Sequence, residues 1–132
     1  MKRDLPLPGG SLEYAVLGAL WDLGTGSARD VHDRVGEPSG LVYTTTAKVL
    51  DRLLAKGLVA RDRAGKAFVY RPKVERAAVE RARAETTVNR LLGDTPRPAI
   101  ASLVDAVESI DPDLLDELAS VVSARRRSRR ES

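Results

Sequence analysis

The stretch Tyr43–Pro72 reads YTTTAKVLDRLLAKGLVARDRAGKAFVYRP, and its hydrophobic period changes once along its length. In the first part, apolar residues recur at three- and four-residue spacings, which indicates a helix with one buried face. Gly57 follows at the place where a helix commonly ends in a left-handed residue. The second part holds two short β-like runs on either side of Gly65, and Pro72 ends the second run because it cannot donate to a strand ladder. This stretch therefore predicts a helix followed by a β-hairpin.

Two further amphipathic segments precede this stretch. Residues 11–24 (SLEYAVLGALWDLG) have a helical apolar face, with Ser11 as a candidate N-cap and Gly24 as a stop. Residues 27–36 (SARDVHDRVG) form a second, shorter candidate helix. Three helices followed by a hairpin with a basic tip are the element order of a winged helix-turn-helix. We therefore predict a mainly α fold with a small β-hairpin, whose winged-helix domain spans residues 1–73.

Residues 74–124 are helical in pattern again and form the predicted dimerisation region. The segments 98–110 and 111–126 carry apolar faces but are too short and isolated to bury these faces unaided. Burial against a second copy of the chain is the simplest solution. The residues expected at this interface are Ile100, Leu103, Val104, Val107, Leu114, Leu115, Leu118, Val121 and Val122. The remaining residues, 125–132, include five arginines and one glutamate, and we expect them to form a disordered basic tail.

The charges are distributed unevenly along the chain. Residues 1–73 carry 12 Lys and Arg against 8 Asp and Glu, whereas residues 74–124 carry 5 against 10. The tail is basic once more. A basic N-terminal part suggests nucleic acid or another polyanion as its partner, because such an asymmetry attracts a ligand of the opposite charge.

Composition excludes several classes of function. There is no cysteine, and His32 is the single histidine, so disulfides, thiolate metal sites and histidine clusters are excluded. No Ser/His/Asp or Cys/His set and no Gly-rich phosphate loop can be assembled. No apolar run approaches the roughly 20 residues of a membrane span. We expect a cytoplasmic protein that is not an enzyme, with no cofactor, no metal and no membrane association.

Three consecutive threonines open the third predicted helix, although one capping hydroxyl would be enough. One interpretation is that the helix start contacts DNA, since a hydroxyl can reach a phosphate or a base edge. The alternative is that one threonine caps the helix and the others are tolerated. We favour DNA contact because basic residues follow one turn later. The predicted DNA contacts are Thr44, Thr45, Lys48 and Arg52 on the helix, and Arg61, Arg63 and Lys66 around the hairpin turn.

Nearby residues give rise to further expectations. Thr46 faces the predicted core, so Thr46→Val should leave DNA binding intact and stabilise the fold. Asp51 is acidic on the exposed side of the same helix, where it can pair with Lys48 or orient Arg52. His32 is expected on the surface of the second helix.

Tyr43–Pro72, together with the preceding LEYAVLGALW and ARDVHDRV segments, resembles the BlaI/MecI penicillinase-repressor family over roughly residues 10–92. The resemblance implies a homodimeric bacterial repressor, in which an N-terminal winged helix reads each half of an inverted-repeat DNA operator. The C-terminal helices would form the dimer. It also implies control of β-lactam-resistance or related genes, and a sensor or protease that relieves repression.

Two departures from the family pattern bear on these implications. Thr46-Ala47-Lys48 stands where the family has Val-x-Thr, so operator preference is expected to differ. The Asn-Phe bond that is cut in well-known members is absent, because Phe68 is the only phenylalanine and Asn89 precedes Arg90. Induction by proteolysis is therefore not expected. The lack of cysteine also separates the chain from copper-responsive relatives.

Two other function classes stay open at this point. A winged-helix protein-interaction module would present its basic face to an acidic protein, and a DNA-architectural protein would bind without sequence preference. Exposed Thr45, Lys48 and Arg52 argue against the first, because a protein-docking helix more often carries apolar anchors. Preference for particular sequences over bulk DNA would separate a repressor from the second.

Overall fold

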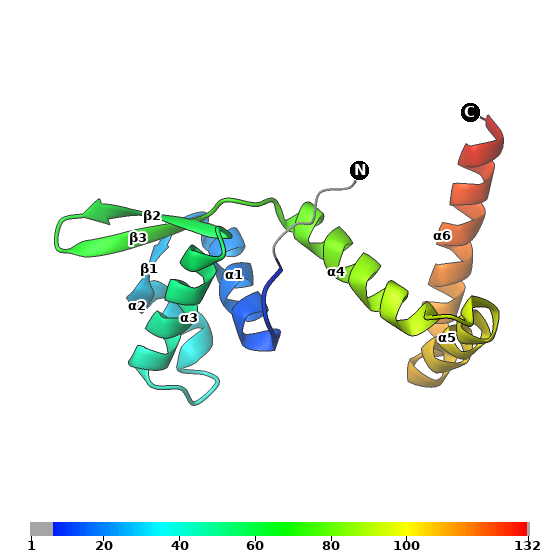
Figure 1. Ribbon diagram of the computed structural model, residues 1–132, viewed down its shortest axis with the longest axis horizontal. Coiled ribbons are helices and arrows are strands. Elements are labelled where there is room, and N and C mark those ends of the chain that lie inside the picture. Colours follow the sequence, from blue (N-terminus) through cyan, green and yellow to red (C-terminus); the bar gives the residue numbers. More distant parts are fainter. Residues whose placement is uncertain (1–6, 132) are drawn as a thin grey trace. The chain divides into compact units, whose positions relative to one another are not determined.

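The computed structural model describes residues 7–131, and the chain divides into two compact units between Glu85 and Thr86. The elements of the N-terminal unit are α1 (Ser11–Leu23), β1 (Gly26–Ser27), α2 (Ala28–Val31), the π-helix η1 (His32–Gly36), α3 (Tyr43–Ala55), β2 (Val59–Ala64) and β3 (Ala67–Pro72). Helix α4 (Arg76–Leu92) begins in this unit, and α5 (Pro96–Ile110) and α6 (Pro112–Glu131) lie in the second (Figure 1). The N-terminal unit has the predicted winged helix-turn-helix order.

Strands β2 and β3 form the predicted antiparallel hairpin, with Arg61 opposite Tyr70 and Arg63 opposite Phe68. Gly65 in the turn has φ 65°, a left-handed conformation that glycine adopts without strain. A third strand, β1, pairs with β3, so the sheet order is β1-β3-β2. The sequence analysis did not predict β1, because a strand of two residues is too short to show an alternating pattern.

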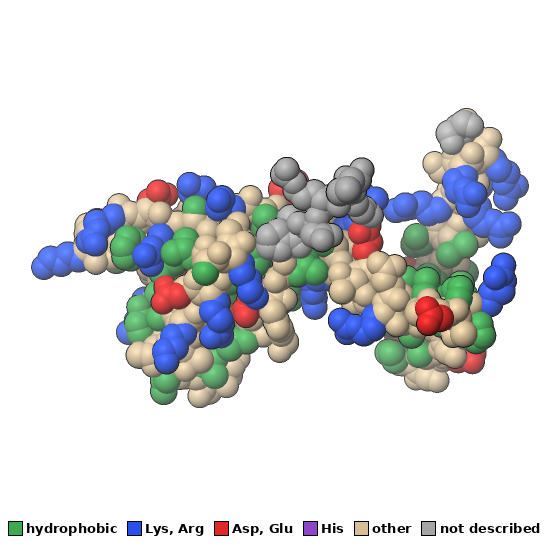
Figure 2. Space-filling model, in the orientation of Figure 1, with side chains coloured by type: hydrophobic (Ala, Val, Ile, Leu, Met, Phe, Trp, Pro, Cys, Tyr) green, Lys and Arg blue, Asp and Glu red, His purple; other side chains and the backbone are tan. Residues whose placement is uncertain are grey.

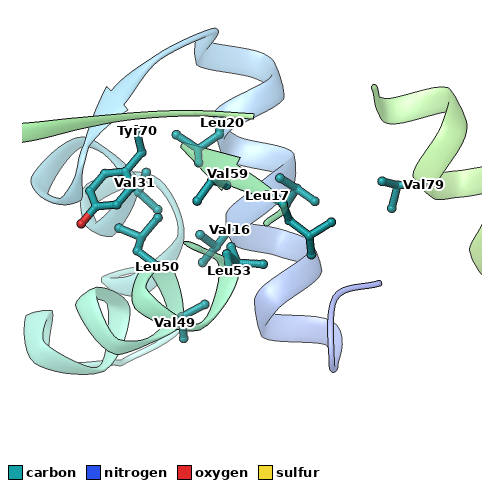
Figure 3. Close-up of a cluster of buried hydrophobic side chains, with 11 residues drawn as sticks. Val16, Leu17, Leu20, Val31, Val49, Leu50, Leu53, Val59, Tyr70 and Val79 are labelled. Carbon is teal, nitrogen blue, oxygen red and sulfur yellow. The ribbon is translucent and has the colours of Figure 1, made fainter. Parts of the chain in front are cut away.

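The core of the N-terminal unit lies mainly between α1, α3 and the sheet (Figure 3). Its buried apolar residues are Val16, Leu17, Leu20, Val31, Val49, Leu50, Leu53, Leu58, Val59, Tyr70 and Val79. The inward face of α3 that the spacing predicts is confirmed, since Val49, Leu50 and Leu53 are fully buried. Each such side chain contributes about 1.5–3 kcal/mol on burial, so this cluster decides which face of α3 points outward.

His32 lies in the core, so its predicted surface position is wrong. Its ring is buried, and its Nδ1 is 2.8 Å from Thr46 Oγ1. A Cβ at Gly36 would collide with both of these groups, so glycine leaves the room that the pair needs. One buried polar pair therefore joins the second helical segment to α3.

The start of α1 is held by a carboxylate rather than by the predicted serine cap. Ser11 is the first helical residue, and the N-cap is Gly10, with no side-chain capping bond. The amide of Gly9 instead donates to Glu13 Oε1 at 3.0 Å. Glu13 is largely buried, so the stability of this end of α1 depends on which groups neutralise the Glu13 carboxylate.

Helix α4 packs onto α1 within the N-terminal unit. The indole Nε1 of Trp21 donates to the Val74 carbonyl at 3.0 Å, and Tyr14 Oη donates to the Glu80 carboxylate at 2.7 Å. The hydrogen bond to Glu80, together with desolvation, raises the pKa of Tyr14. The compact unit therefore extends into α4, beyond the boundary at residue 73 that the sequence suggests.

Helices α5 and α6 pack against each other in the second unit. They meet at Asp111, whose Oδ1 accepts a hydrogen bond from the Asp113 amide at 2.9 Å and so caps α6. Helix α6 continues to Glu131, and the arginine-rich segment predicted to be disordered is helical up to that residue. Arginine is a good helix former, and cations are favoured at a helix C-terminus, which accounts for the longer helix.

Candidate nucleic-acid interface

The start of α3 is open to solvent and carries no side-chain cap. Val42 is the N-cap and makes no side-chain capping bond, so the interpretation in which one threonine caps the helix is wrong. Thr44 is exposed and Thr45 is half-buried, whereas Thr46 is only 1% exposed. Two threonines therefore lie in the first turn of the helix, where the Thr45 amide donates to the Val42 carbonyl at 3.0 Å. The third belongs to the core, as the sequence predicts for Thr46.

Lys48 and Arg52 lie on the exposed side of α3 but differ in their surroundings. Lys48 is exposed and has no ionic partner among residues 7–131. Arg52 is also exposed, yet its Nε is 3.5 Å from Glu13 Oε2 on α1. Lys56 approaches the same carboxylate more closely, with Nζ 2.7 Å from Oε1. Lys48 is therefore available to a ligand, whereas Arg52 already forms an ion pair with Glu13 within the fold.

The carboxylate of Glu13 on α1 attracts the basic side chains of Arg52 and Lys56 at the end of α3. Burial alone raises the pKa of Glu13. Hydrogen bonds from Lys56 and the Gly9 amide, with the nearby charges of Lys56 and Arg52, outweigh this effect and lower the pKa below its ordinary value. The carboxylate is therefore ionised at neutral pH, and it ties α1 to the C-terminal half of α3.

Strand β2 brings two arginines next to the exposed side of α3. The Nη1 of Arg61 is 3.8 Å from Asp51 Oδ1, so Asp51 pairs with the hairpin rather than with a neighbour on its own helix. This corrects both sequence-based accounts of Asp51. The guanidinium carbons of Arg61 and Arg63 lie 4.1 and 5.0 Å from the ring centroid of Phe68. The aromatic ring therefore supports two cations on one side of the hairpin.

The other predicted wing residue, Lys66, is exposed at the hairpin turn. Between the two arginines, Asp62 alternates to the opposite side of β2, where its Oδ2 is 3.3 Å from Arg71 Nε. On that side one carboxylate meets one guanidinium, whereas the side with Arg61 carries two guanidinium groups, of which only Arg61 meets a carboxylate of the described residues, that of Asp51. Figure 2 shows Lys and Arg side chains along the hairpin and at its tip.

Arg29 on α2 is a candidate contact that the sequence analysis missed. Its guanidinium carbon is 4.5 Å from the ring centroid of Tyr43, the first residue of α3. The ring of His32 meets the same tyrosine edge-on at 5.6 Å. Arg29 is exposed, and this contact places it beside the start of α3. Only docking the second helix against the third could have revealed this, because Arg29 is distant from the threonines in sequence.

The exposed cations around α3 and along the hairpin form what we call the basic surface. Its members are Arg29, Lys48, Arg61, Arg63 and Lys66. Among residues 7–131, no group of three or more His, Asp or Glu is placed to hold a metal ion. In the same part of the chain, no helix is long and apolar enough to cross a membrane. The chemistry that the structure gathers is therefore cationic, supplemented by hydroxyls at a helix start.

The model of one protein family, described as penicillinase repressor, matches residues 9–124. The chain belongs to the penicillinase repressor family. This confirms the resemblance found in the sequence, and members of this family are DNA-binding transcriptional repressors. The match ends before the arginine-rich end of α6, so those arginines lie outside the matched residues.

Solved structures similar to this penicillinase repressor family member include two other transcriptional regulators. The DNA-binding domain of the repressor BlaI is 26% identical, with a TM-score of 0.49, over 58% of this chain and 92% of that one. The PcaV transcriptional regulator from Streptomyces coelicolor, in complex with its natural ligand, is 28% identical, with a TM-score of 0.49, over 78% of this chain and 74% of that one. No curated protein matches the chain.

Proposed function

We propose that this protein is a homodimeric repressor that binds an inverted-repeat DNA operator, with α3 of each copy in the major groove of one half-site. The observation that carries this proposal is the start of α3, where Thr44 and Thr45 stand at an uncapped helix end and Lys48 follows on the exposed side. A recognition helix contacts bases with its N-terminal residues, and hydroxyl and ammonium groups there suit base edges and phosphates.

The hairpin supplies contacts to the DNA backbone. Arg61 and Arg63 are held over Phe68 on the side of β2 that meets α3 through Asp51. Lys66 extends the positive charge to the turn. Phosphate contacts of this kind add affinity and fix register without reading sequence. Arg52 contributes less than the sequence suggests, because it is shared with Glu13.

The second unit supports dimerisation. Each predicted interface residue is either exposed or half-buried, and no residue of α5 or α6 is buried. Ile100 is 51% exposed and Val121 is 50% exposed, although both are apolar. Apolar faces of this kind mark protein interfaces, and a two-fold dimer would present two recognition helices to an inverted repeat.

Selection of preferred sequences from random duplexes tests this function. A repressor of the proposed kind selects a two-fold symmetric sequence with half-sites about one or two helical turns apart. Recovery of DNA without a consensus would favour the architectural alternative. Failure to retain DNA at low salt would favour the protein-interaction module. Because the family is named for penicillinase repression, promoters of β-lactam-resistance genes are the first natural duplexes to compare with the selected sequence.

A further inference from the structure

We propose that α6 pairs antiparallel with α6 of a second copy of this chain, so that the arginine-rich end of one helix lies beside the acidic α5–α6 junction of the other. This inference rests on the proposed function, because it requires the homodimer. It adds the orientation of the helices and a role for arginines that lie outside the family match, which ends at residue 124.

Helix α6 carries an exposed apolar stripe. Leu114 is 43% exposed, Val121 is 50% exposed and Val122 is 46% exposed. Leu114, Leu118 and Val121 follow one another at spacings of four and three residues, which places them on one side of the helix. Arg125 comes four residues after Val121 and continues the same side. The apolar stripe therefore leads directly into the arginine-rich end.

Charge is separated along the second unit. The α5–α6 junction carries Glu108, Asp111 and Asp113, all of them exposed. The far end of α6 carries Arg125, Arg126, Arg127, Arg129 and Arg130. Arg126, Arg129 and Arg130 line an open hollow in this end, as expected for residues three and four apart on one side of a helix. Figure 2 shows basic side chains gathered on α6 and acidic side chains over the part of the second unit nearer α5.

This separation distinguishes between the two ways in which a pair of α6 helices can meet. Parallel pairing would bring the arginine-rich ends of both copies together, and like charges in contact are destabilising. Antiparallel pairing instead sets each basic end against an acidic junction, which is the complementarity that fixes orientation at helical interfaces. The apolar stripe alone is compatible with both orientations, so the charges decide between them.

The stripe also defines the register. Leu118 is midway between Leu114 and Val122, so a two-fold axis near Leu118 covers the whole stripe. Leu114 then lies against the partner's Val122, and Arg125 lies beside the partner's Asp111. DNA could also attract these arginines, but it offers no apolar surface to cover the stripe that runs into them. A second copy satisfies both features together.

Introduced cysteines report the orientation directly, because the chain has no cysteine of its own. Leu114→Cys and Val122→Cys chains, coexpressed at full length and oxidised, should form a disulfide-linked dimer that neither variant forms alone. Leu118→Cys should link to itself. Self-linking of Val122→Cys would overturn the antiparallel orientation. The absence of any disulfide link in protein that sediments as a dimer would also overturn this orientation. Neither of these two results would contradict the proposed homodimer. A monomer in sedimentation would overturn the homodimer and this inference with it.

Charge reversal tests the role of the arginines. Arg125→Glu with Arg129→Glu should raise the dimer dissociation constant by about tenfold at low salt, and the effect should shrink as salt increases. Arg90→Glu with Arg97→Glu makes the same change in net charge within the second unit and serves as the matched control. An unchanged dimer that loses affinity for all DNA sequences would assign these arginines to DNA and overturn the proposal.

Discussion

The buried pair of Thr46 and His32 leads to a prediction opposite to that drawn from the sequence. Removing the Thr46 hydroxyl leaves His32 Nδ1 buried without its partner at 2.8 Å. Thr46→Val should therefore lower the free energy of unfolding by about 1–3 kcal/mol, rather than raise it. Thermal melting measures this, with Thr46→Ser as the control that keeps the hydroxyl. Melting of Thr46→Val at or above the wild-type temperature would show that the pair contributes nothing.

Thr45 and Lys48 are the side chains whose loss should affect sequence preference. Lys48→Ala should weaken binding to the preferred operator by about 1–3 kcal/mol and relax preference at one position in each half-site. Thr45→Val removes a hydrogen bond but keeps a methyl that can contact thymine. Operator titration against bulk DNA measures both effects, with Arg90→Ala in the second unit as a charge control. Equal losses on operator and bulk DNA would place these residues on phosphates.

At the level of elements, Glu13 couples α1 to α3. Its pKa in the folded protein is lowered, so its ion pair stabilises the fold fully above the ordinary pKa of about 4.5. This stabilisation is lost as the pH falls through the lowered value. Glu13→Gln should cost about 1–2 kcal/mol at pH 7, and the difference from wild type should vanish in acid. Melting curves from pH 7 to pH 3 measure it, and a difference independent of pH would exclude the ionic origin.

The β2–β3 hairpin should behave as a wing that binds phosphate. Arg61→Ala with Arg63→Ala should weaken binding to every DNA sequence to the same degree and reduce the slope of affinity against salt by about one unit for each lost contact. Arg71→Ala, on the opposite side of the hairpin, is the matched control. A loss confined to the preferred operator would mean that these arginines read bases.

At the level of the whole molecule, dimerisation should depend on the second unit. Deleting residues 94–132 removes α5 and α6 and retains the core cluster that stabilises the N-terminal unit. The shortened chain should be a folded monomer that binds a single half-site, and therefore binds the full operator much more weakly. Sedimentation and operator titration measure both properties. A shortened chain that remains a dimer would place the interface in the N-terminal unit.

The amino-acid sequence alone determined the order of helices and hairpin, the inward face of α3 and the family. These features follow from local periods and turn residues, such as the spacing of Val49, Leu50 and Leu53 and the glycine at position 65. The helical state of residues 125–131 was missed, although it too is local, because the charge run was given more weight than the helix propensity of arginine.

Only the tertiary structure decided which polar and charged side chains are partners. Sequence spacing limits pairing to neighbours on one helix, whereas Asp51 pairs with Arg61 on β2 and Arg52 approaches Glu13 on α1. His32 was misplaced for the same reason, since its partner Thr46 comes from another helix. The amino-acid sequence specifies the charge and size of each side chain. The group that it meets depends on how distant segments pack, and packing is a property of the folded chain as a whole.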